Sequence, residues 1–338
     1  MTNTANMSGS GGQNFGEKDD FKLEEKVSSE SEGIRLLQQG YLQSYIDFFY
    51  ITTDTTPSEI QPSIKLKEEQ RLNKRAGKTR FEQNQDSLLS LSDNLKQAEN
   101  YQREGNRENN KYIKECLKQY AKVAQQFEEL NDWETASYFH KRCLDVSVEY
   151  KYSTGEVNAL KGLGICEEKV LNIFEAMNYM ETAHENCVTN GLPNLEKAIS
   201  KELVRVYQII AIDFQEREEF NHALEYFEKC LQASQRANEK EKEAECYQRI
   251  GLIHDKLGDL DKAIACLTRF LEVCQREMKT GSRDKEGEAH KLLADVHAKN
   301  GNVQMAIHHL GELMNIAEAE NKTQAQADAA LQLGLLHY

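Results

Sequence analysis

The sequence predicts an all-α fold, a right-handed superhelical solenoid of helix pairs with a period of about 40 residues. One proline, Pro193, lies beyond residue 64, in a region rich in Ala, Leu, Glu, Lys and Gln that favours helices. The mean hydropathy of −0.71 suits thin cores with wide polar faces. The third observation is a spacing of small residues that recurs along the same region.

This spacing is clearest in RIGLIHDKLGDLDKAIACL, residues 249–267, where it consists of Gly251, His254, Ala263 and Leu267. Four other complete copies begin at Ala124, Gly164, Ala211 and Ala294, and a further copy begins at Gly334. The residue twelve positions after each first small residue is alanine in all five complete copies: Ala136, Ala176, Ala223, Ala263 and Ala306. Two closely packed antiparallel helices need small residues at their contact, where a larger side chain costs roughly 1–3 kcal/mol.

Sharp turns are expected between the two helices of a pair, as at LGD (257–259) and NGN (300–302). Gly258 and Gly301 are predicted to adopt the positive φ that ends a helix. Asp259 and Asn302 are then placed to cap the following helix. Larger apolar residues such as Phe227 and Leu267 are expected to fill the interfaces between neighbouring pairs.

The spacing resembles the tetratricopeptide repeat, in which small residues place the first helix of a pair against the second. The usual period is about 34 residues, whereas the copies here begin 40, 47, 40, 43 and 40 residues apart. The extra residues fall between copies, as in segments 147–160 and 275–290. We therefore predict long-period tetratricopeptide-like helix pairs over residues 84–338, with the last repeat incomplete.

Three further segments are predicted before this array. Residues 1–32 have almost no aliphatic content and are expected to be disordered. Residues 33–51 are predicted to form an amphipathic aromatic helix, with Leu37, Tyr41, Tyr45 and Phe49 on one face. This helix either caps the array, which we favour, or docks a partner. Residues 52–83 contain two prolines and are predicted to be a linker with a basic stretch.

The charge distribution limits the classes of partner. A formal net charge of −14 argues against general affinity for nucleic acid or anionic membranes. The linker is the exception, because basic residues cluster there: Lys65, Lys67, Arg71, Lys74, Arg75, Lys78 and Arg80. These are candidate contacts for an acidic surface such as that of tubulin; the alternative is a basic stretch without a partner.

The sequence carries no sign of export or of catalysis. Its eight cysteines include no CxxC pair, and neither a signal peptide nor a membrane-spanning run is visible, so we expect an intracellular, soluble protein. AGKT (76–79) has Leu72 where a phosphate-binding loop needs glycine. Neighbouring helical residues such as His308 and His309 point about 100° apart and chelate poorly. We therefore expect no enzyme activity, catalytic residue, cofactor, metal or small-molecule substrate.

The remaining candidate site is the concave groove. In this architecture the first helix of each pair lines the groove, and helical geometry places eleven polar residues there: Asn158, Lys161, Glu168, Arg205, Gln208, Glu245, Gln248, Asp255, Glu288, Lys291 and Asp295. The wall becomes more acidic toward the C-terminal end. It suits an extended or helical partner segment that carries basic residues. The alternative interpretation is a solvated helix face.

A closer resemblance rests on five segments, in this order: GYLQSYIDFF (40–49), NLKQAEN (94–100), YFHKRCLDVS (138–147), LGICEEKVLNIFEAMNYMETAHE (163–185) and RIGLIHDKLGDLDKAIACLTRFLEVCQ (249–275). The run from about residue 33 to residue 338 resembles the tetratricopeptide repeat protein 29 family of ciliary and flagellar axonemal proteins. The resemblance implies a non-enzymatic scaffold in the cytoplasm and the axoneme of cilia or flagella. Its role would be axoneme or dynein-arm assembly and ciliary motility, with axonemal or dynein-associated proteins as partners.

The alternative function is that of a cytosolic tetratricopeptide adaptor. Kinesin light chain and polarity scaffolds have long-period arrays that this sequence also resembles. The basic stretch and the aromatic helix favour the axonemal scaffold, because they offer additional docking points.

Overall fold

The computed structural model describes residues 29–52, 85–105, 112–277 and 283–336, and every regular element in these ranges is an α-helix. In order they are α1 (Ser29–Gln38), α2 (Leu42–Thr52), α4 (Gln85–Gly105), α5 (Ile113–Glu129), α6 (Trp133–Glu149), α7 (Ser153–Lys169), α8 (Ile173–Thr189), α9 (Pro193–Glu216), α10 (Phe220–Ala237), α11 (Lys240–Leu257), α12 (Leu260–Glu277), α13 (Asp284–Lys299), α14 (Val303–Ala319) and α15 (Thr323–Leu336). The basic stretch and nearly all of the predicted tail and linker lie outside the described residues.

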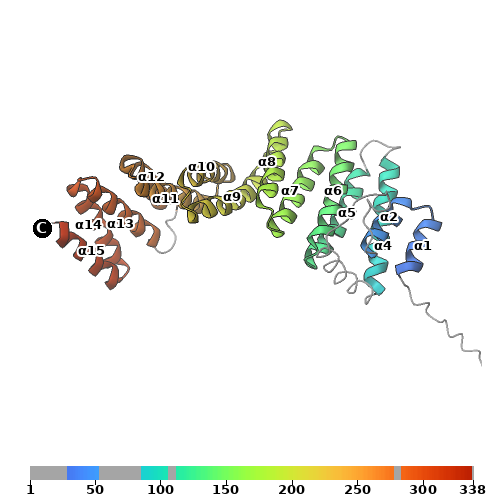
Figure 1. Ribbon diagram of the computed structural model, residues 1–338, viewed down its shortest axis with the longest axis horizontal. Coiled ribbons are helices and arrows are strands. Elements are labelled where there is room, and N and C mark those ends of the chain that lie inside the picture. Colours follow the sequence, from blue (N-terminus) through green and yellow to red (C-terminus); the bar gives the residue numbers. More distant parts are fainter. Residues whose placement is uncertain (1–28, 53–84, 106–111, 278–282, 337–338) are drawn as a thin grey trace, which may run out of the picture.

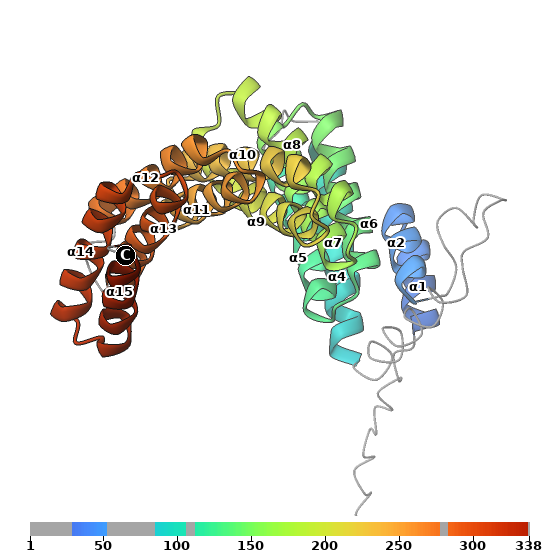
Figure 2. The same ribbon diagram turned by 60° about the vertical axis from the view of Figure 1, so that its left-hand side comes forward.

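The helices pack in sequence order, which confirms the predicted solenoid. Each helix contacts its neighbour along the chain, from α4 to α15, and the pairs α5–α6, α7–α8, α9–α10, α11–α12 and α13–α14 are the predicted repeats. The result is an elongated array, with α1 at one end and α15 at the other (Figure 1). Figure 2 shows that the array curves, with α9, α11, α13 and α15 along its inner side and α10, α12 and α14 outside.

The small residues of the repeat lie where the helices of a pair approach. All five alanines at the second small position are fully buried. A Cβ atom added to Gly251 would lie 2.8 Å from Cγ of Leu267, and one added to Gly164 would lie 2.8 Å from Cε of Met180. Leu267 therefore packs within its own pair as well as against α13, with which it shares a core.

Each turn between paired helices has one residue with positive φ, seven positions after the first small residue. Gly258 (φ 81°) and Gly301 (φ 75°) occupy this position as predicted. In the three earlier repeats the residue is not glycine: it is Asn131, Leu171 or Glu218. Asn302 is the N-cap residue of α14, as predicted, but its side chain accepts no hydrogen bond from that helix.

The predicted aromatic helix over 33–51 is two helices, because Gly40 breaks it with φ 83°. The break changes the buried face: Leu36 and Phe48 are fully buried, whereas Leu37 is largely exposed. Both buried side chains join the core of α4, α5 and α6. This packing favours the interpretation of the aromatic segment as a cap.

Polar contacts also hold the cap on the array. Glu99 of α4 accepts hydrogen bonds from the backbone N–H (2.8 Å) and the hydroxyl (2.7 Å) of Ser44. Asp47, completely buried on α2, accepts a hydrogen bond from the Tyr138 hydroxyl of α6 over 2.6 Å. Burial raises the pKa of Asp47 to about 6, against the opposing charge of Arg142.

Candidate functional site: the concave face

The candidate site is the inner wall formed by the first helices α7, α9, α11 and α13. The eleven predicted groove residues are all exposed or half-buried, and none belongs to a hydrophobic core. They fall there because each lies three or six positions before the small residue that faces the second helix, or one or four positions after it. Their role in binding a partner remains a prediction.

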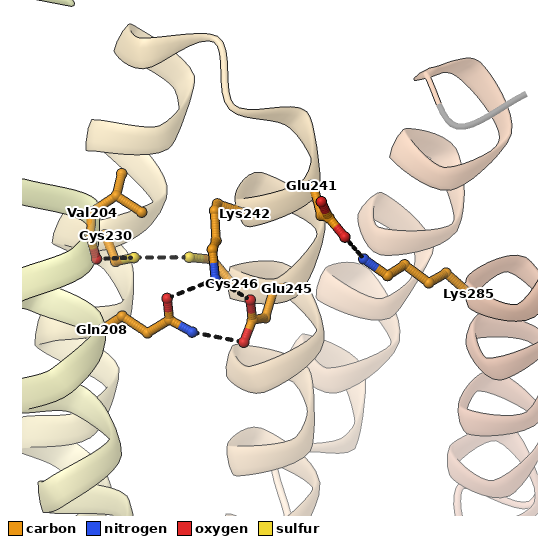
Figure 3. Close-up of polar contacts among 8 residues, drawn as sticks. All are labelled: Val204, Gln208, Cys230, Glu241, Lys242, Glu245, Cys246 and Lys285. Carbon is orange, nitrogen blue, oxygen red and sulfur yellow. Dashed lines mark hydrogen bonds and ion pairs between the residues drawn. The ribbon is translucent and has the colours of Figure 1, made fainter. Parts of the chain in front are cut away.

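Neighbouring first helices are joined across this wall by polar contacts. On α9 and α11, the Nε2 of Gln208 donates a hydrogen bond to Oε1 of Glu245 over 2.7 Å. The Nζ of Lys242 lies 3.0 Å from Oε1 of Gln208 and 3.0 Å from Oε2 of Glu245 (Figure 3). These three side chains form a closed network that links two successive repeats.

The same kind of link joins α7 to α9. The Nη2 of Arg205 lies 2.6 Å from Oε2 of Glu168 and 3.0 Å from Oε2 of Glu202. The Nζ of Lys161 lies 3.2 Å from Oε1 of Glu202. Four charged side chains from two helices therefore alternate in sign along the wall.

The links continue from α11 to α13. Gln248 donates to Glu288 over 2.8 Å. The Nζ of Lys299 lies 2.6 Å from Oδ2 of Asp255. Figure 3 shows the second contact, in which the Nζ of Lys285 lies 2.6 Å from Oε1 of Glu241. The link from α13 to α15 is longer: Gln332 donates to Asp295 over 3.4 Å.

The links change the interpretation of the predicted residues. Nine of the eleven pair with a side chain one repeat away, or on the neighbouring first helix. Within the described part of the chain, only Asn158 and Lys291 of the eleven form no such contact. Exposed ion pairs contribute only about 0–1 kcal/mol each. They do, however, neutralise much of the charge that a partner would otherwise meet.

The two remaining residues each line a cleft. Asn158 lies in a cleft of about 280 Å³ between α5, α6 and α7, which also has Lys114 and Lys118 on its lining. Lys291 lies in a cleft of about 310 Å³ between α13, α14 and α15. The apolar residues of this second cleft include Leu313, Ile316 and Ala329. A groove that looks uniformly polar from the sequence therefore has two places where an apolar side chain fits.

The C-terminal cleft has a cause in the repeat itself. The residue seven positions before the first small residue becomes smaller along the array, in the order Leu117, Val157, Val204, Ala244 and Gly287. At Gly287 no side chain covers α14, and an added Cβ would lie 3.4 Å from Cδ1 of Leu313. The decrease in side-chain size can be read from the sequence. It predicts a cleft only once the structure shows which helix face this position occupies.

The two clefts differ in charge. Lys114 and Lys118 make the lining of the N-terminal cleft basic. The C-terminal cleft has charges of both signs on its lining: Arg283, Lys291, Lys322, Asp284, Glu288, Glu320 and Asp328. The charged side chains of the N-terminal cleft are therefore basic, whereas those of the C-terminal cleft are mixed.

Cys246, beside this wall, is a buried free thiol. The sulfur atoms of Cys230 and Cys246 lie 3.2 Å apart as free thiols, and Cys230 donates to the carbonyl of Val204 (Figure 3). The hydrogen bond to Cys230, and then burial, raises the pKa of Cys246. A thiol that keeps its proton is inert as a nucleophile.

Among the described residues, none of the helices combines the length and the apolar character that crossing a bilayer requires.

Comparisons with known proteins agree with this architecture. Residues 202–276, which span α9 to α12, match the family model of the tetratricopeptide repeat. Tetratricopeptide repeat protein 29 of Homo sapiens is 23% identical over 205 residues. That match covers 57% of this chain and 41% of the human protein, so the chain spans less than half of its relative.

Two solved structures resemble the backbone. BtubC (BKLC) from P. vanneervenii has a TM-score of 0.39 at 18% identity, over 68% of this chain and 91% of its own. Aspartyl phosphate phosphatase F from Bacillus subtilis has a TM-score of 0.34 at 12% identity, over 92% of this chain and 95% of its own. No function is taken from either likeness.

Proposed function

We propose that this protein is a non-enzymatic scaffold that holds a segment of another protein on its concave face. The observation that carries the proposal is the pair of clefts at opposite ends of a wall that is otherwise closed by its own polar links. Tetratricopeptide-type arrays present curved surfaces of this kind to extended or helical partners. The match to the repeat family supports this general function.

The clefts define the partner more closely than the wall does. An apolar side chain of the partner enters each cleft, because both clefts have apolar linings. An acidic group beside the first apolar side chain meets Lys114 and Lys118. The second cleft carries charges of both signs, so it selects the apolar side chain and no particular charge beside it. The acidic group alone then sets the direction of the partner segment, with its acidic end toward α5.

The cellular setting that we propose is the axoneme of cilia or flagella. The five segments that resemble the tetratricopeptide repeat protein 29 family support it, and so does the human relative at 23% identity. Axonemal or dynein-associated proteins are then the partners, in axoneme or dynein-arm assembly and ciliary motility. The basic residues from Lys65 to Arg80, outside the described residues, are a second proposed contact, toward the acidic surface of tubulin.

The test is a fractionation of isolated cilia. The tagged protein is expressed in a ciliated cell, the membrane is removed with detergent, and the tag is followed by immunoblot. Retention with the microtubules supports a structural axonemal scaffold, and release into the soluble ciliary fraction supports a role in assembly or transport.

Two results would contradict the proposal. Absence of the tag from cilia would leave the cytosolic adaptor of the kinesin-light-chain or polarity-scaffold type. Turnover of a nucleotide by the pure protein would contradict the non-enzymatic part.

A further inference from the structure

Three side chains that can bind a metal ion meet at the junction of the first two repeats. Glu128 lies near the end of α5, His140 on α6 and Cys166 near the end of α7. One oxygen, nitrogen or sulfur atom from each lies within 4.8 Å of the other two. Glu128 and His140 are already joined by a contact of 2.7 Å between Oε1 and Nε2.

His140 departs from the repeat pattern. It lies sixteen positions after the first small residue, where the four other complete repeats have a buried apolar side chain: Met180, Phe227, Leu267 or Leu310. A polar ring at such a position costs free energy unless its nitrogen atoms have partners. The solenoid needs an apolar residue here for packing, so packing alone does not account for histidine.

A second departure accommodates the first. A Cβ atom added to Gly162 of α7 would lie 2.3 Å from Nδ1 of His140, so the ring occupies the space that a side chain would fill. The corresponding residues of the other repeats all have larger side chains: Lys122, Ile209, Arg249 and Leu292. Glycine inside a helix costs about 1 kcal/mol relative to alanine. Gly162 therefore lowers helix stability and His140 replaces an apolar core residue, and both lie beside Glu128 and Cys166.

We propose that Glu128, His140 and Cys166 bind a zinc ion. Carboxylate, imidazole and thiolate are zinc donors, and three protein ligands leave the fourth tetrahedral position for water. The soft sulfur and the imidazole favour zinc over magnesium or calcium, which prefer oxygen donors only. On binding, the Cys166 thiol loses its proton to solvent and its sulfur forms the bond to the metal.

The consequence is a link between repeats. Because the three ligands come from α5, α6 and α7, the ion fastens the first helix pair to the first helix of the second pair. The side chain of Glu128 keeps 30% of its surface accessible, which gives an entry path from solvent. This inference does not depend on the proposed scaffold function.

The test is titration of the purified full chain with Co²⁺, a coloured substitute for Zn²⁺. We expect one ion per chain, a near-ultraviolet sulfur-to-cobalt charge-transfer band, visible bands of tetrahedral intensity, and loss of all of them when Zn²⁺ is added. Zn²⁺ is also expected to raise the unfolding temperature.

Two variants and a control make the test specific. Cys166→Ala should abolish the charge-transfer band, and His140→Leu should weaken binding at least roughly tenfold. Because leucine is the residue of the pattern at this position, His140→Leu should fold normally, which circular dichroism checks. Cys187→Ala, at a buried cysteine that belongs to no such group of three ligand atoms among the described residues, should bind like the wild type. The proposal is overturned if Co²⁺ gives no saturable band, or if the band persists in Cys166→Ala.

Discussion

The amide of Gln208 on α9 donates a hydrogen bond to the carboxylate of Glu245 on α11, one repeat further along the chain. Both residues fit the predicted groove, but each is occupied by the other and by Lys242. The polar wall therefore links successive first helices, and we expect a partner to bind where these links are interrupted.

Removing Lys242 should weaken this link in a salt-dependent way. Lys242→Ala is expected to lower the free energy of unfolding by about 0.5–1 kcal/mol at low salt, and by less at high salt, because exposed ion pairs are screened. Urea unfolding at two salt concentrations measures this. Lys197→Ala, at an exposed position of α9, is the control and should change little.

Two glycine substitutions should have effects of opposite sign. Gly251→Leu places a large side chain where a Cβ alone already approaches Leu267, so it should destabilise the protein by roughly 1–3 kcal/mol. Gly311→Ala on α14 meets no atom within 4 Å and should stabilise it by about 0.5–1 kcal/mol. Thermal unfolding compares the two. Equal stability of both variants would contradict the packing of the repeat described above.

Leu171 has a left-handed backbone conformation (φ 65°) and 82% of its surface is exposed. That conformation costs a non-glycine residue roughly 1–2 kcal/mol, partly offset by the greater freedom of glycine in the unfolded chain. Leu171→Gly should therefore raise stability by up to about 1 kcal/mol. Gly258→Ala at the equivalent position should lower it. Chemical denaturation of both variants checks the pair of signs.

Lowering the pH should stabilise the N-terminal end of the array around α2. Burial raises the pKa of Asp47 to about 6 from an ordinary 3.8, so the folded state binds this proton more tightly than the unfolded state does. Its contribution is fully present below pH 3.8 and is lost as the pH rises through 6, an effect of about 3 kcal/mol. Hydrogen exchange of α2 should therefore slow between pH 7 and pH 5, after correction for the intrinsic rate. In Asp47→Asn this pH dependence should disappear.

Lowering the pH should destabilise the C-terminal end of the array around α13 and α14. Burial, and then the neighbouring His290, His297 and His308, lowers the pKa of His309 to about 4 from 6.5. Its contribution is present above pH 6.5 and is lost as the pH falls through 4. Exchange in α13 and α14 should thus accelerate in the pH range where exchange in α2 slows. The same trend at both ends would contradict one of the two assignments.

The sequence predicts the repeats well because their small residues obey hard packing limits. Ala136, Ala176 and the later alanines recur at one spacing, and each is buried. Polar partners are harder to foresee: Lys242 and Gln208 lie 34 residues apart in a chain with many charges. This separation is shorter than the 40 residues between the two repeats, so the repeat spacing in the sequence does not pair them.

Local exceptions were also beyond the sequence. Leucine rarely adopts a left-handed conformation, so the residue type at 171 does not predict the turn. Only the repeat position, which Leu171 shares with Gly258, indicates it. His140 stands at a repeat position that is apolar in the other complete copies, but only the structure brings Glu128 and Cys166 beside it. The C-terminal cleft forms where Gly287 has no side chain. The pattern of hydrophobic residues in the sequence does not predict such a cleft.

The central claim is that the concave face binds a protein segment at its two clefts. The most direct measurement replaces Asn158, Lys291 or, on the outer helix α12, the exposed Ala265 with a photoreactive residue, and crosslinks each variant in ciliated cells. The account predicts that positions 158 and 291 crosslink to the same partner and position 265 does not. It further predicts that Gly287→Leu, which fills the C-terminal cleft, removes the crosslink at 291. Crosslinking that is equal at all three positions, or confined to position 265, would contradict the account.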